Sequence, residues 1–272
     1  MPELPEVETL ARHLHHLLAG AVFSSVEVCW LRSVAMPTPQ EFACTLPGRT
    51  ILGVGRRGKF VQFSLSDSYY LLVHLRMSGQ LQVKPLDTSA DKHARLIFNL
   101  TNGRKLVFYD PRKFGRVYLA TDPTLVTGDL GPEPLSDDFT PDVFAALLSR
   151  HKAALKPLLL NQAFLAGLGN IYTDEALFAA GLHPLHKANT LTPTEVERLY
   201  LAIREVLQQA IRNRGTTLPD ARYRDAEGQP GNNQEYLRVY RRTGEPCPRC
   251  GTPIERVLVG QRGTHYCPNC QK

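Results

Sequence analysis

The pattern of apolar and polar positions divides the chain into a strand-rich first part and a helix-rich second part. Between residues 22 and 120, short runs of β-branched and aromatic residues are separated by turn residues, and Val61, Phe63 and Leu65 alternate with polar positions. The predicted strands cover residues 22–28, 50–54, 60–65, 69–75, 81–83, 95–100, 105–109 and 116–120. Asn102-Gly103 predicts a hairpin. Such regular short strands predict a β-sandwich or barrel.

Helical periodicity occurs at the front of the chain and again after residue 140. Leu4 begins the leading helix, Pro5 fits its first position and Gly20 ends it. Further helices are predicted from Thr140, over residues 156–166, from the turn at 167–170 to residue 180, and from a capping box at Thr192. The Gly- and Pro-rich residues 131–138 are predicted to be an interdomain linker. The fold class is therefore α+β, with more than one domain.

Residues 213–235 carry Gly, Pro, Asn, Asp and Arg with little apolar content. This composition predicts a mobile loop, and long loops in compact domains are often functional.

Length, composition and charge narrow the class of protein. The 272 residues suffice for two domains, and neither a membrane-length apolar run nor a signal peptide is present. The net charge is +6, and residues 238–272 hold seven Lys and Arg against two acidic residues, a net of +5. A basic module favours a polyanion partner such as nucleic acid. A solvated basic surface is the alternative interpretation, and charge alone does not separate the two.

The six cysteines fall into two groups. Cys29 and Cys44 stand alone among apolar residues and are predicted to be small buried hydrophobes. The other four form two C-x-x-C pairs, Cys247 with Cys250 and Cys267 with Cys270. This spacing predicts a structural zinc ion held by four thiolates, with no position left open for catalysis and no catalytic metal. Disulfides would need an oxidising compartment, of which the sequence carries no sign.

The first residues could form a catalytic centre. Met1 before a small residue is normally trimmed, so we expect Pro2 to carry a secondary amine. An α-amino group has a pKa of about 7.7–8.0, so much of it is neutral and nucleophilic near pH 7. Glu3 stands beside it as a possible acid or base. The alternative is an ordinary surface helix with a frayed start.

Five further polar positions could contact a ligand: Lys59 after Arg56-Arg57-Gly58, His74 at a strand end, the loop at 110–115, the glycine turn at 167–170, and the ribbon tip at 261–264. Glycine permits close backbone approach, and backbone N–H groups at a helix start bind phosphate. Hairpin turns, a helix corner and a solvated charge are the corresponding structural alternatives.

Five motifs together resemble bacterial formamidopyrimidine-DNA glycosylase, of the formamidopyrimidine/endonuclease VIII family. They are MPELPEVET, HLRMSG, DPRKFG, LAGLGNIYTDEALF, and the C-x-x-C pairs with QRGTHYCPNCQ, and they span the whole chain. The resemblance implies a base-excision repair enzyme that removes 8-oxoguanine and formamidopyrimidines from double-stranded DNA and nicks the abasic site by β,δ-elimination. It also implies a monomer in the bacterial cytoplasm, associated with the nucleoid and not with a membrane.

The resemblance assigns catalytic roles to four residues. Pro2 would attack C1′ and form a Schiff base, and Glu3 would donate a proton at the sugar. Lys59 would contact phosphate and assist the first elimination, and Arg262 would serve the second.

The resemblance also assigns DNA contacts and domains. Met77, Arg112 and Phe114 would fill the space left by the flipped nucleotide, with Arg112 on the orphaned cytosine. The implied backbone contacts are His74, His93, Lys152, Lys156 and Asn170. The implied domains are a catalytic β-sandwich (1–132), a hinge linker (133–139), a helix–two-turn–helix domain with a lesion-side loop at 213–235 (140–235), and a zinc finger (236–272).

Some residues depart from the family pattern, and two alternatives stay open. Arg76 stands where glycine is common, and Asn232-Asn233 where aromatic residues are common. An endonuclease VIII-type enzyme would prefer oxidised pyrimidines, but Met77, Arg112 and Phe114, and Leu4 in place of glycine, argue against it. A non-catalytic zinc-ribbon protein that binds DNA or RNA would not need Pro2.

Overall fold

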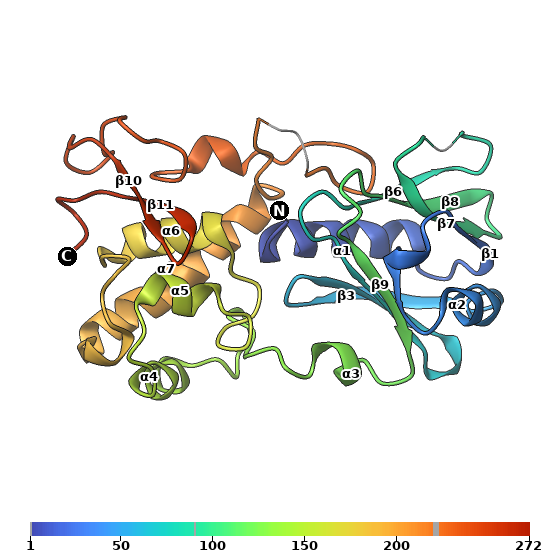
Figure 1. The fold of residues 1–272 in the computed structure, drawn as a ribbon, viewed down its shortest axis with the longest axis horizontal. Helices are drawn as coiled ribbons and strands as arrows, with labels where there is room; N and C mark the ends of the chain where they lie inside the picture. Colours follow the sequence, from blue (N-terminus) through green and yellow to red (C-terminus); the bar gives the residue numbers. More distant parts are fainter. Residues whose placement is uncertain (1, 90, 220–222) are drawn as a thin grey trace. The chain divides into compact units, whose positions relative to one another are not determined.

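The computed structural model describes residues 2–89, 91–219 and 223–272. The chain forms two compact units (Figure 1). The first unit is Met1–Asp129 with Asn213–Gln234, and the second is Leu130–Arg212 with Glu235–Lys272. Segment 213–234 thus groups with the strand-rich unit, although it follows the last long helix in sequence. The domain boundaries expected from the sequence stay predictions.

The first sheet of the strand-rich unit has four antiparallel strands in the order β1-β7-β8-β6. They are β1 (Phe23–Val28), β6 (Gln80–Pro85), β7 (Ala94–Leu100) and β8 (Arg104–Tyr109). β7 and β8 form the hairpin predicted at Asn102-Gly103. Gly103 has a φ of +77° there, a left-handed conformation that glycine adopts without strain.

The second sheet has five strands in the order β2-β9-β5-β4-β3. They are β2 (Val34–Met36), β3 (Ile51–Arg57), β4 (Phe60–Leu65), β5 (Tyr70–His74) and β9 (Arg116–Ala120). β2 runs parallel to β9, and every other neighbouring pair is antiparallel. The 3-10 turn η1 (Leu31–Ser33) precedes β2, and η2 (Ser66–Ser68) joins β4 to β5.

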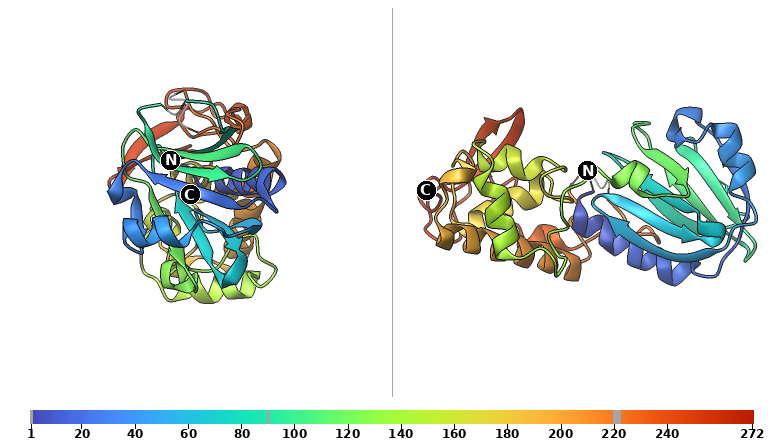
Figure 2. Two further views of the ribbon diagram at one scale, coloured as in Figure 1. Left: turned by 90° about the vertical axis from the view of Figure 1, so that its right-hand side faces the viewer. Right: turned by 90° about the horizontal axis from the view of Figure 1, so that it is seen from below.

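The two sheets form the layers of a sandwich around one apolar core (Figure 2). Phe63 and Leu71 from one sheet and Phe98 and Phe108 from the other are fully buried in it. Because burying each such side chain contributes about 1.5–3 kcal/mol, this core dominates the stability of the unit. The predicted β-sandwich is confirmed, and the sheets do not close into the barrel that the strand pattern also allowed.

Helix α1 (Leu4–Leu18) packs against strands of both sheets. Val7, Leu10 and Leu14 recur at helical spacing and are fully buried, as their pattern predicted. The helix stops two residues before Gly20, whose φ is +84°. At its other end, α1 begins at Leu4, directly after the N-cap residue Glu3.

Some features of this unit differ from the sequence predictions. Helix α2 (Pro39–Thr45) was not predicted, although Thr38 and Glu41 form a capping box around Pro39. β2 and helix α3 (Thr124–Thr127) were also missed. The prediction that Cys29 and Cys44 are buried is wrong, since both are exposed.

The second unit is built on four helices. They are α4 (Pro141–Ser149), α5 (Leu155–Leu160), α6 (Asn170–Ala180) and α7 (Pro193–Arg212). The 3-10 turn η3 (Ala188–Thr190) precedes α7, and the predicted capping box forms, because Thr192 N donates to Glu195 Oε2 at 2.8 Å. The predicted helix over 156–166 ends early, at Leu160. The chain leaves the helical conformation at Asn161, whose ψ is 113°, and the Asn161 side chain accepts from Ala163 N at 3.1 Å in place of a helical carbonyl.

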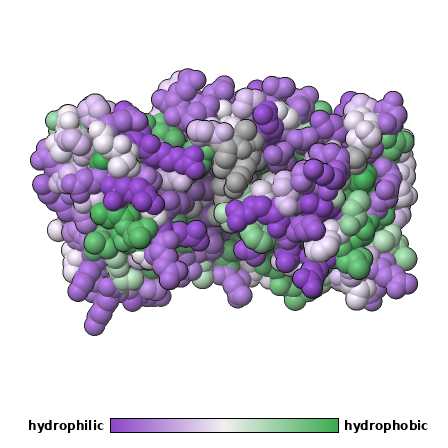
Figure 3. Space-filling view, turned by 45° about the horizontal axis from the view of Figure 1, so that its top comes forward, coloured by the Kyte–Doolittle hydropathy of each residue, from purple (hydrophilic) through white to green (hydrophobic). Residues whose placement is uncertain are grey.

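The last part of the second unit is a two-stranded hairpin. The 3-10 turn η4 (Asn233–Tyr236) comes first, and β10 (Glu255–Val259) then pairs with β11 (Arg262–Tyr266). Gly260 and Gln261 both have positive φ, as the turn of a tight two-residue hairpin requires. Among the described helices, none has the length and apolar character of a membrane span. Hydrophilic residues cover most of the face shown in Figure 3.

Candidate active site

Pro2 and Glu3 are buried at the start of α1. Glu6, in the first turn, holds this region through two backbone hydrogen bonds. Its Oε2 accepts from Glu3 N at 2.8 Å, and its Oε1 accepts from Thr216 N at 2.7 Å. The carboxylate of Glu6 therefore links the N-terminus, where the nucleophile is predicted, to the segment at 213–234.

The segment at 213–234 is held on the first unit by several contacts. Ala226 lies in the sandwich core, and its carbonyl accepts from Val83 N of β6 at 2.9 Å. The buried Asp225 accepts from the backbone N–H groups of Glu227 and Gln229 and pairs with Arg214. The described part of this segment is therefore a docked element, which the sequence suggested only as a mobile loop. The three residues 220–222 of the predicted loop lie outside the described residues.

The turn between β3 and β4 carries Lys59 and is tied to α1. Arg56 donates to Glu8 of α1 at 3.0 Å and to Gly58 O at 3.1 Å. Burial raises the pKa of Glu8, but the charges and hydrogen bonds of Arg56 and Arg12 outweigh burial and lower it. The ion pair thus fixes the turn, and with it the largely buried Lys59, against the leading helix.

His74, at the end of β5, is a neutral imidazole. Burial, followed by the positive charges of Arg76 and Lys59, lowers its pKa to about 3. Its Nδ1 accepts from Arg76 N at 3.1 Å, so Nε2 carries the proton and can donate. Its ring meets Phe60 edge to face, with 4.6 Å between centroids. A phosphate contact by His74 would therefore be a neutral hydrogen bond and not an ion pair.

Two loops present the residues predicted to fill the duplex. Met77 follows β5, and Phe114 lies between β8 and β9; their exposed fractions are 37% and 47%. The guanidinium of Arg112 stacks over the Phe114 ring at 4.9 Å. Lys113 lies over the Trp30 ring at 3.9 Å. Large apolar side chains left exposed beside cations are suited to insertion between bases.

Arg76 adopts a backbone conformation that favours glycine. Its φ is +53°, in the left-handed region where a Cβ atom is strained. Glycine would adopt this conformation without strain. The chain retains arginine there and so adds a positive charge beside Met77 and His74.

The other predicted contacts differ in how accessible they are. His93 lies just before β7 and is half-buried, and Lys152 is exposed between α4 and α5. Lys156 is fully buried, and its ammonium pairs with Asp174. That ammonium is occupied inside the unit, and the predicted phosphate contact of Lys156 stays a prediction.

Asn170 begins α6 and is hydrogen-bonded to the hairpin of β10 and β11. Its Nδ2 donates to Gly263 O at 2.9 Å, and its Oδ1 is buried with no hydrogen-bond partner among the described residues. Arg262, one residue before Gly263, is exposed at the hairpin tip. The helix start that was predicted to bind phosphate and the predicted catalytic arginine therefore belong to one hydrogen-bonded assembly in the second unit.

Two neighbouring carboxylates on α6 bind the zinc-finger region. Asp174 Oδ2 accepts from His265 N at 3.0 Å and lies 3.1 Å from His265 Nδ1. Glu175 accepts from three successive backbone N–H groups, at residues 238, 239 and 240. Burial raises the pKa of Glu175, against the lowering effect of these hydrogen bonds. At the other end of α6, Arg249 donates to the carbonyls of Phe178 and Ala179.

The four cysteines predicted to bind zinc come together. Their Sγ atoms all lie within 4.8 Å of one another, with 3.9 Å between Cys247 and Cys270 and 3.5 Å between Cys250 and Cys267. A tetrahedral site with Zn–S bonds of ~2.3 Å requires Sγ atoms roughly 3.8 Å apart. The cluster therefore fits a structural zinc ion, which would fix the two knuckles of the finger.

The functional residues that sequence patterns missed are mostly buried acids. Glu6, Asp110, Asp174, Glu175 and Asp225 are each nearly inaccessible and accept backbone hydrogen bonds. Acidic residues inside the apolar stretch of α6 were a visible signal for two of them. For the other three, the sequence carries no periodic signal.

Replacing His74 with Gln should make stability less dependent on pH. The neutral folded form excludes a proton that the unfolded chain binds below pH 6.5, so wild-type stability falls as pH decreases from 6.5 towards 3. Between pH 6.5 and 5 the wild type should lose about 1–2 kcal/mol more than His74→Gln. Denaturant melts at the two pH values measure this, and NMR should show no His74 titration above pH 5.

Arg76→Gly is the companion variant. Removing the charge should raise the pKa of His74, and relieving the positive φ should leave the protein at least as stable as the wild type. An unchanged NMR titration of His74 would contradict the assigned role of Arg76.

Zinc removal should disorder the finger and leave the sandwich folded. The knuckles depend on the metal, whereas the first unit has its own core. After chelation, affinity for duplex DNA should fall about tenfold or more while the strand signal in circular dichroism persists. Added zinc should restore binding, and unchanged affinity after verified metal loss would refute the expectation.

Comparison with known families gives the same picture along the whole chain. The family model of the formamidopyrimidine-DNA glycosylase N-terminal domain matches residues 1–117, and that of its H2TH domain matches residues 130–221. A model described as a zinc finger found in FPG and IleRS matches residues 244–272.

Similar proteins cover the chain from end to end. Formamidopyrimidine-DNA glycosylase of Herpetosiphon aurantiacus is 50% identical over 100% of both chains, and that of Protochlamydia amoebophila is 47% identical over 100% of both. The Lactococcus lactis Fpg structure in complex with DNA containing an abasic site has a TM-score of 0.92 and 38% identity, covering 99% of each chain. MutM (Fpg) of Thermus thermophilus has a TM-score of 0.90 and 43% identity, covering 99% of this chain and 98% of that one. On these grounds, the chain belongs to the formamidopyrimidine-DNA glycosylase family.

Proposed function

We propose that this chain excises oxidised purines from damaged duplex DNA and then cleaves the abasic strand through the amine of Pro2. Family membership over the full length carries the glycosylase activity. It is supported by structural neighbours whose complexes contain DNA with an abasic site or a formamidopyrimidine lesion. The observation that carries the choice of nucleophile is the placement of Pro2 and Glu3 at the N-terminus of α1.

The proposed reaction uses the amine without a metal ion. With Met1 removed, the nitrogen of Pro2 attacks C1′ of the lesion nucleotide, and the base leaves with the electron pair of its glycosidic bond and takes up a proton. Glu3 donates a proton to the ring oxygen, which opens the sugar and leaves a cationic Schiff base. The positive end of α1 disfavours the protonated amine and so increases its nucleophilic fraction.

Two eliminations then cut the strand. Loss of a C2′ proton expels the 3′ phosphate, and a second proton loss expels the 5′ phosphate, while water releases the sugar fragment from Pro2. Lys59 contacts the phosphate beside the lesion during the first step, and Arg262 during the second. The ion pair of Arg56 with Glu8 supports the first assignment, because it fixes the turn that carries Lys59.

Binding divides between the two units. In the first, Met77, Arg112 and Phe114 fill the space of the flipped nucleotide, with Arg112 on the orphaned cytosine and His74 and His93 on the backbone. In the second, Lys152 and Asn170 contact phosphate. Inserted side chains and phosphate contacts offset the few kcal/mol that base extrusion costs. We further propose a monomer that acts on the nucleoid in a bacterial cytoplasm, since the similar proteins are bacterial.

Blocking the amine should abolish strand cleavage. Borohydride reduces a Schiff base to a stable amine, so the wild type should become covalently linked to lesion DNA at Pro2. A form with an uncleaved N-terminal extension should give no adduct and cleave at least about a hundredfold more slowly, because an amide nitrogen is not nucleophilic. The same extension placed at the C-terminus is the matched control. A fully active N-terminally extended protein, or an adduct on another side chain, would overturn the mechanism.

The substrate class is tested by a direct comparison. Single-turnover excision of 8-oxoguanine opposite cytosine should exceed excision of thymine glycol by about tenfold or more, because Arg112 is assigned to an orphaned cytosine. Faster removal of thymine glycol would assign the chain to oxidised pyrimidines instead.

A further inference from the structure

We propose that Asp110 is a positioning residue that joins the two DNA-filling loops into one rigid wedge. The inference rests on the proposed function, because it concerns how Met77, Arg112 and Phe114 are held while a base is extruded. Asp110 touches neither the sugar nor the base in this proposal. It acts through the loops at 75–79 and 110–115.

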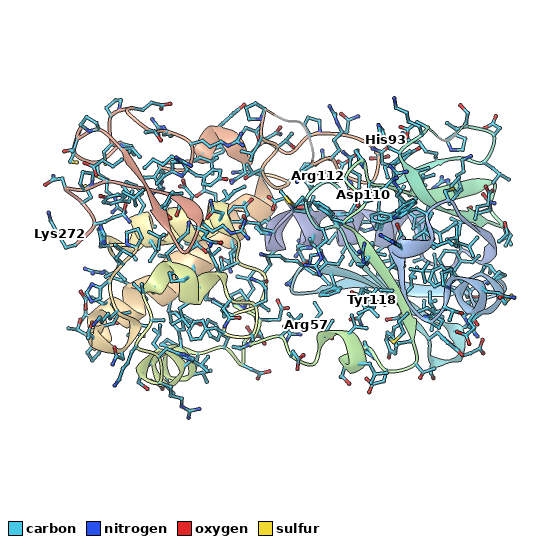
Figure 4. The ribbon with its side chains drawn as sticks, in the orientation of Figure 1. Arg57, His93, Asp110, Arg112, Tyr118 and Lys272 are labelled. Atoms are coloured by element: carbon cyan, nitrogen blue, oxygen red, sulfur yellow. The ribbon has the colours of Figure 1, made fainter. Side chains whose placement is uncertain are left out.

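The carboxylate of Asp110 contacts both loops. Oδ1 accepts from Ser78 Oγ at 2.5 Å and from Arg112 N at 3.2 Å, and Oδ2 accepts from Gly115 N at 2.7 Å. Ser78 is the neighbour of Met77, whereas Arg112 and Gly115 bracket the second loop. Asp110 has an exposed fraction of 0%, so water does not compete for these bonds. Figure 4 labels Asp110 and Arg112, which lie close together just after the end of β8.

The main chain of Asp110 is equally fixed. Its N–H donates to His93 O at 2.9 Å, and its carbonyl accepts from Arg95 Nε at 2.8 Å and from Lys113 N at 3.2 Å. Arg95 is itself buried and also donates to Lys92 O. The bonds to His93 and Arg95 therefore anchor the main chain of Asp110 to the start of β7.

Two glycines let the loops approach this anchor. A Cβ atom on Gly115 would overlap the Phe108 ring, and a Cβ atom on Gly79 would overlap both Leu75 O and the same ring. Both loops therefore pack on Phe108, whose side chain is fully buried in the sandwich core. The carboxylate bonds the loops at the point where this close packing brings them together.

The side chains of the wedge are not fixed by burial or by relaxed backbone conformation. Met77 and Phe114 are substantially exposed, and Arg76 and Lys113, one in each loop, have the strained φ values of +53° and +61°. Extruding a stacked base costs a few kcal/mol, so the side chains that displace it must be held rigidly. A flexible loop would move aside instead of displacing the base. Hydrogen bonds to a buried carboxylate, which are roughly twice as strong as neutral ones, supply the stiffness.

Asparagine would not replace this aspartate. Each carboxylate oxygen faces one backbone N–H group, which can only donate: Arg112 N–H at Oδ1 and Gly115 N–H at Oδ2. The NH₂ group of an asparagine would therefore confront one of these two N–H groups in either orientation, although the Ser78 hydroxyl could turn to accept from it. Asp110→Asn is nearly isosteric and therefore tests the bonds and not the packing. Asp122→Asn is the control, because Asp122 in the same unit also accepts from a backbone N–H and a hydroxyl, those of Thr124, away from the two loops.

The experiment compares two substrates in single turnover. On 8-oxoguanine paired with cytosine, Asp110→Asn should be slower than wild type by about tenfold or more, since that base must be extruded. On a preformed abasic site, which has no base to extrude, the loss should stay within about threefold. Asp122→Asn should match the wild type on both. Equal losses on the two substrates would show a general structural defect, and no loss on either would show that Asp110 is not needed; both overturn the proposal.

A double-mutant cycle checks that Asp110 acts through the wedge. In a Met77→Ala/Arg112→Ala/Phe114→Ala background the effect of Asp110→Asn on paired 8-oxoguanine should shrink to within about twofold, because the three side chains that it positions are gone. A purely structural role would give the same fold-loss in both backgrounds, which would refute the proposal. If Asp110→Asn melts before the assay temperature, Ser78→Ala is the second variant: it removes the bond to Asp110 and the bond that Ser78 Oγ accepts from Arg112 N, and it leaves the bond of Gly115 intact. It should show the same substrate difference at smaller size, and equal losses with it would count against the proposal. A wild type that forms no borohydride adduct would instead refute the proposed function.

Discussion

The structure depends on buried carboxylates that accept hydrogen bonds from the backbone of irregular segments. Loops that approach DNA lack strand or helix partners, so their N–H groups need other acceptors wherever they are buried. A carboxylate offers about four acceptor positions on one short side chain. Glu6, Asp110 and Asp225 perform this role in the first unit, and Asp174 and Glu175 in the second. Each is almost completely buried, so the bonds are protected from water.

These carboxylates explain how rigid layers support functional segments. The sandwich core and α1 form the rigid part of the first unit, and Glu6 attaches the start of segment 213–234 to the N-terminus of that helix. In the second unit, α6 serves the same purpose along its whole length. Its first residue, Asn170, and Asp174 bond the β10–β11 hairpin. Glu175 binds the backbone of residues 238–240, and the carbonyls at the C-terminal end bind Arg249 between two zinc-binding cysteines. A zinc ion at the four cysteines would therefore order a finger that α6 already holds by hydrogen bonds.

Particular residues show where sequence patterns succeed and fail. The strands, the Asn102-Gly103 hairpin and the four-cysteine cluster follow from local chemistry, and the structure contains all of them. Helix α2 was missed although its capping box is local, because its apolar content is too small to stand out. The helix predicted to 166 stops at 160, because Asn161 leaves the helical conformation and its side chain accepts from Ala163 N. Cys29 and Cys44 were misplaced, because apolar neighbours in sequence do not guarantee burial in space.

The sequence by itself determined the strand-rich first part, the helical second part, the zinc cluster and, through its motifs, the family. These depend on periodicity and on short-range spacing, which each segment carries alone. The tertiary structure decided which unit holds segment 213–234, that the sheets stay open, that Arg76 has a positive φ, and that Lys156 is buried against Asp174. It also decided that Asp110 meets Ser78, thirty-two residues earlier. Such contacts join residues far apart in sequence, and only packing brings their donors and acceptors within hydrogen-bond distance.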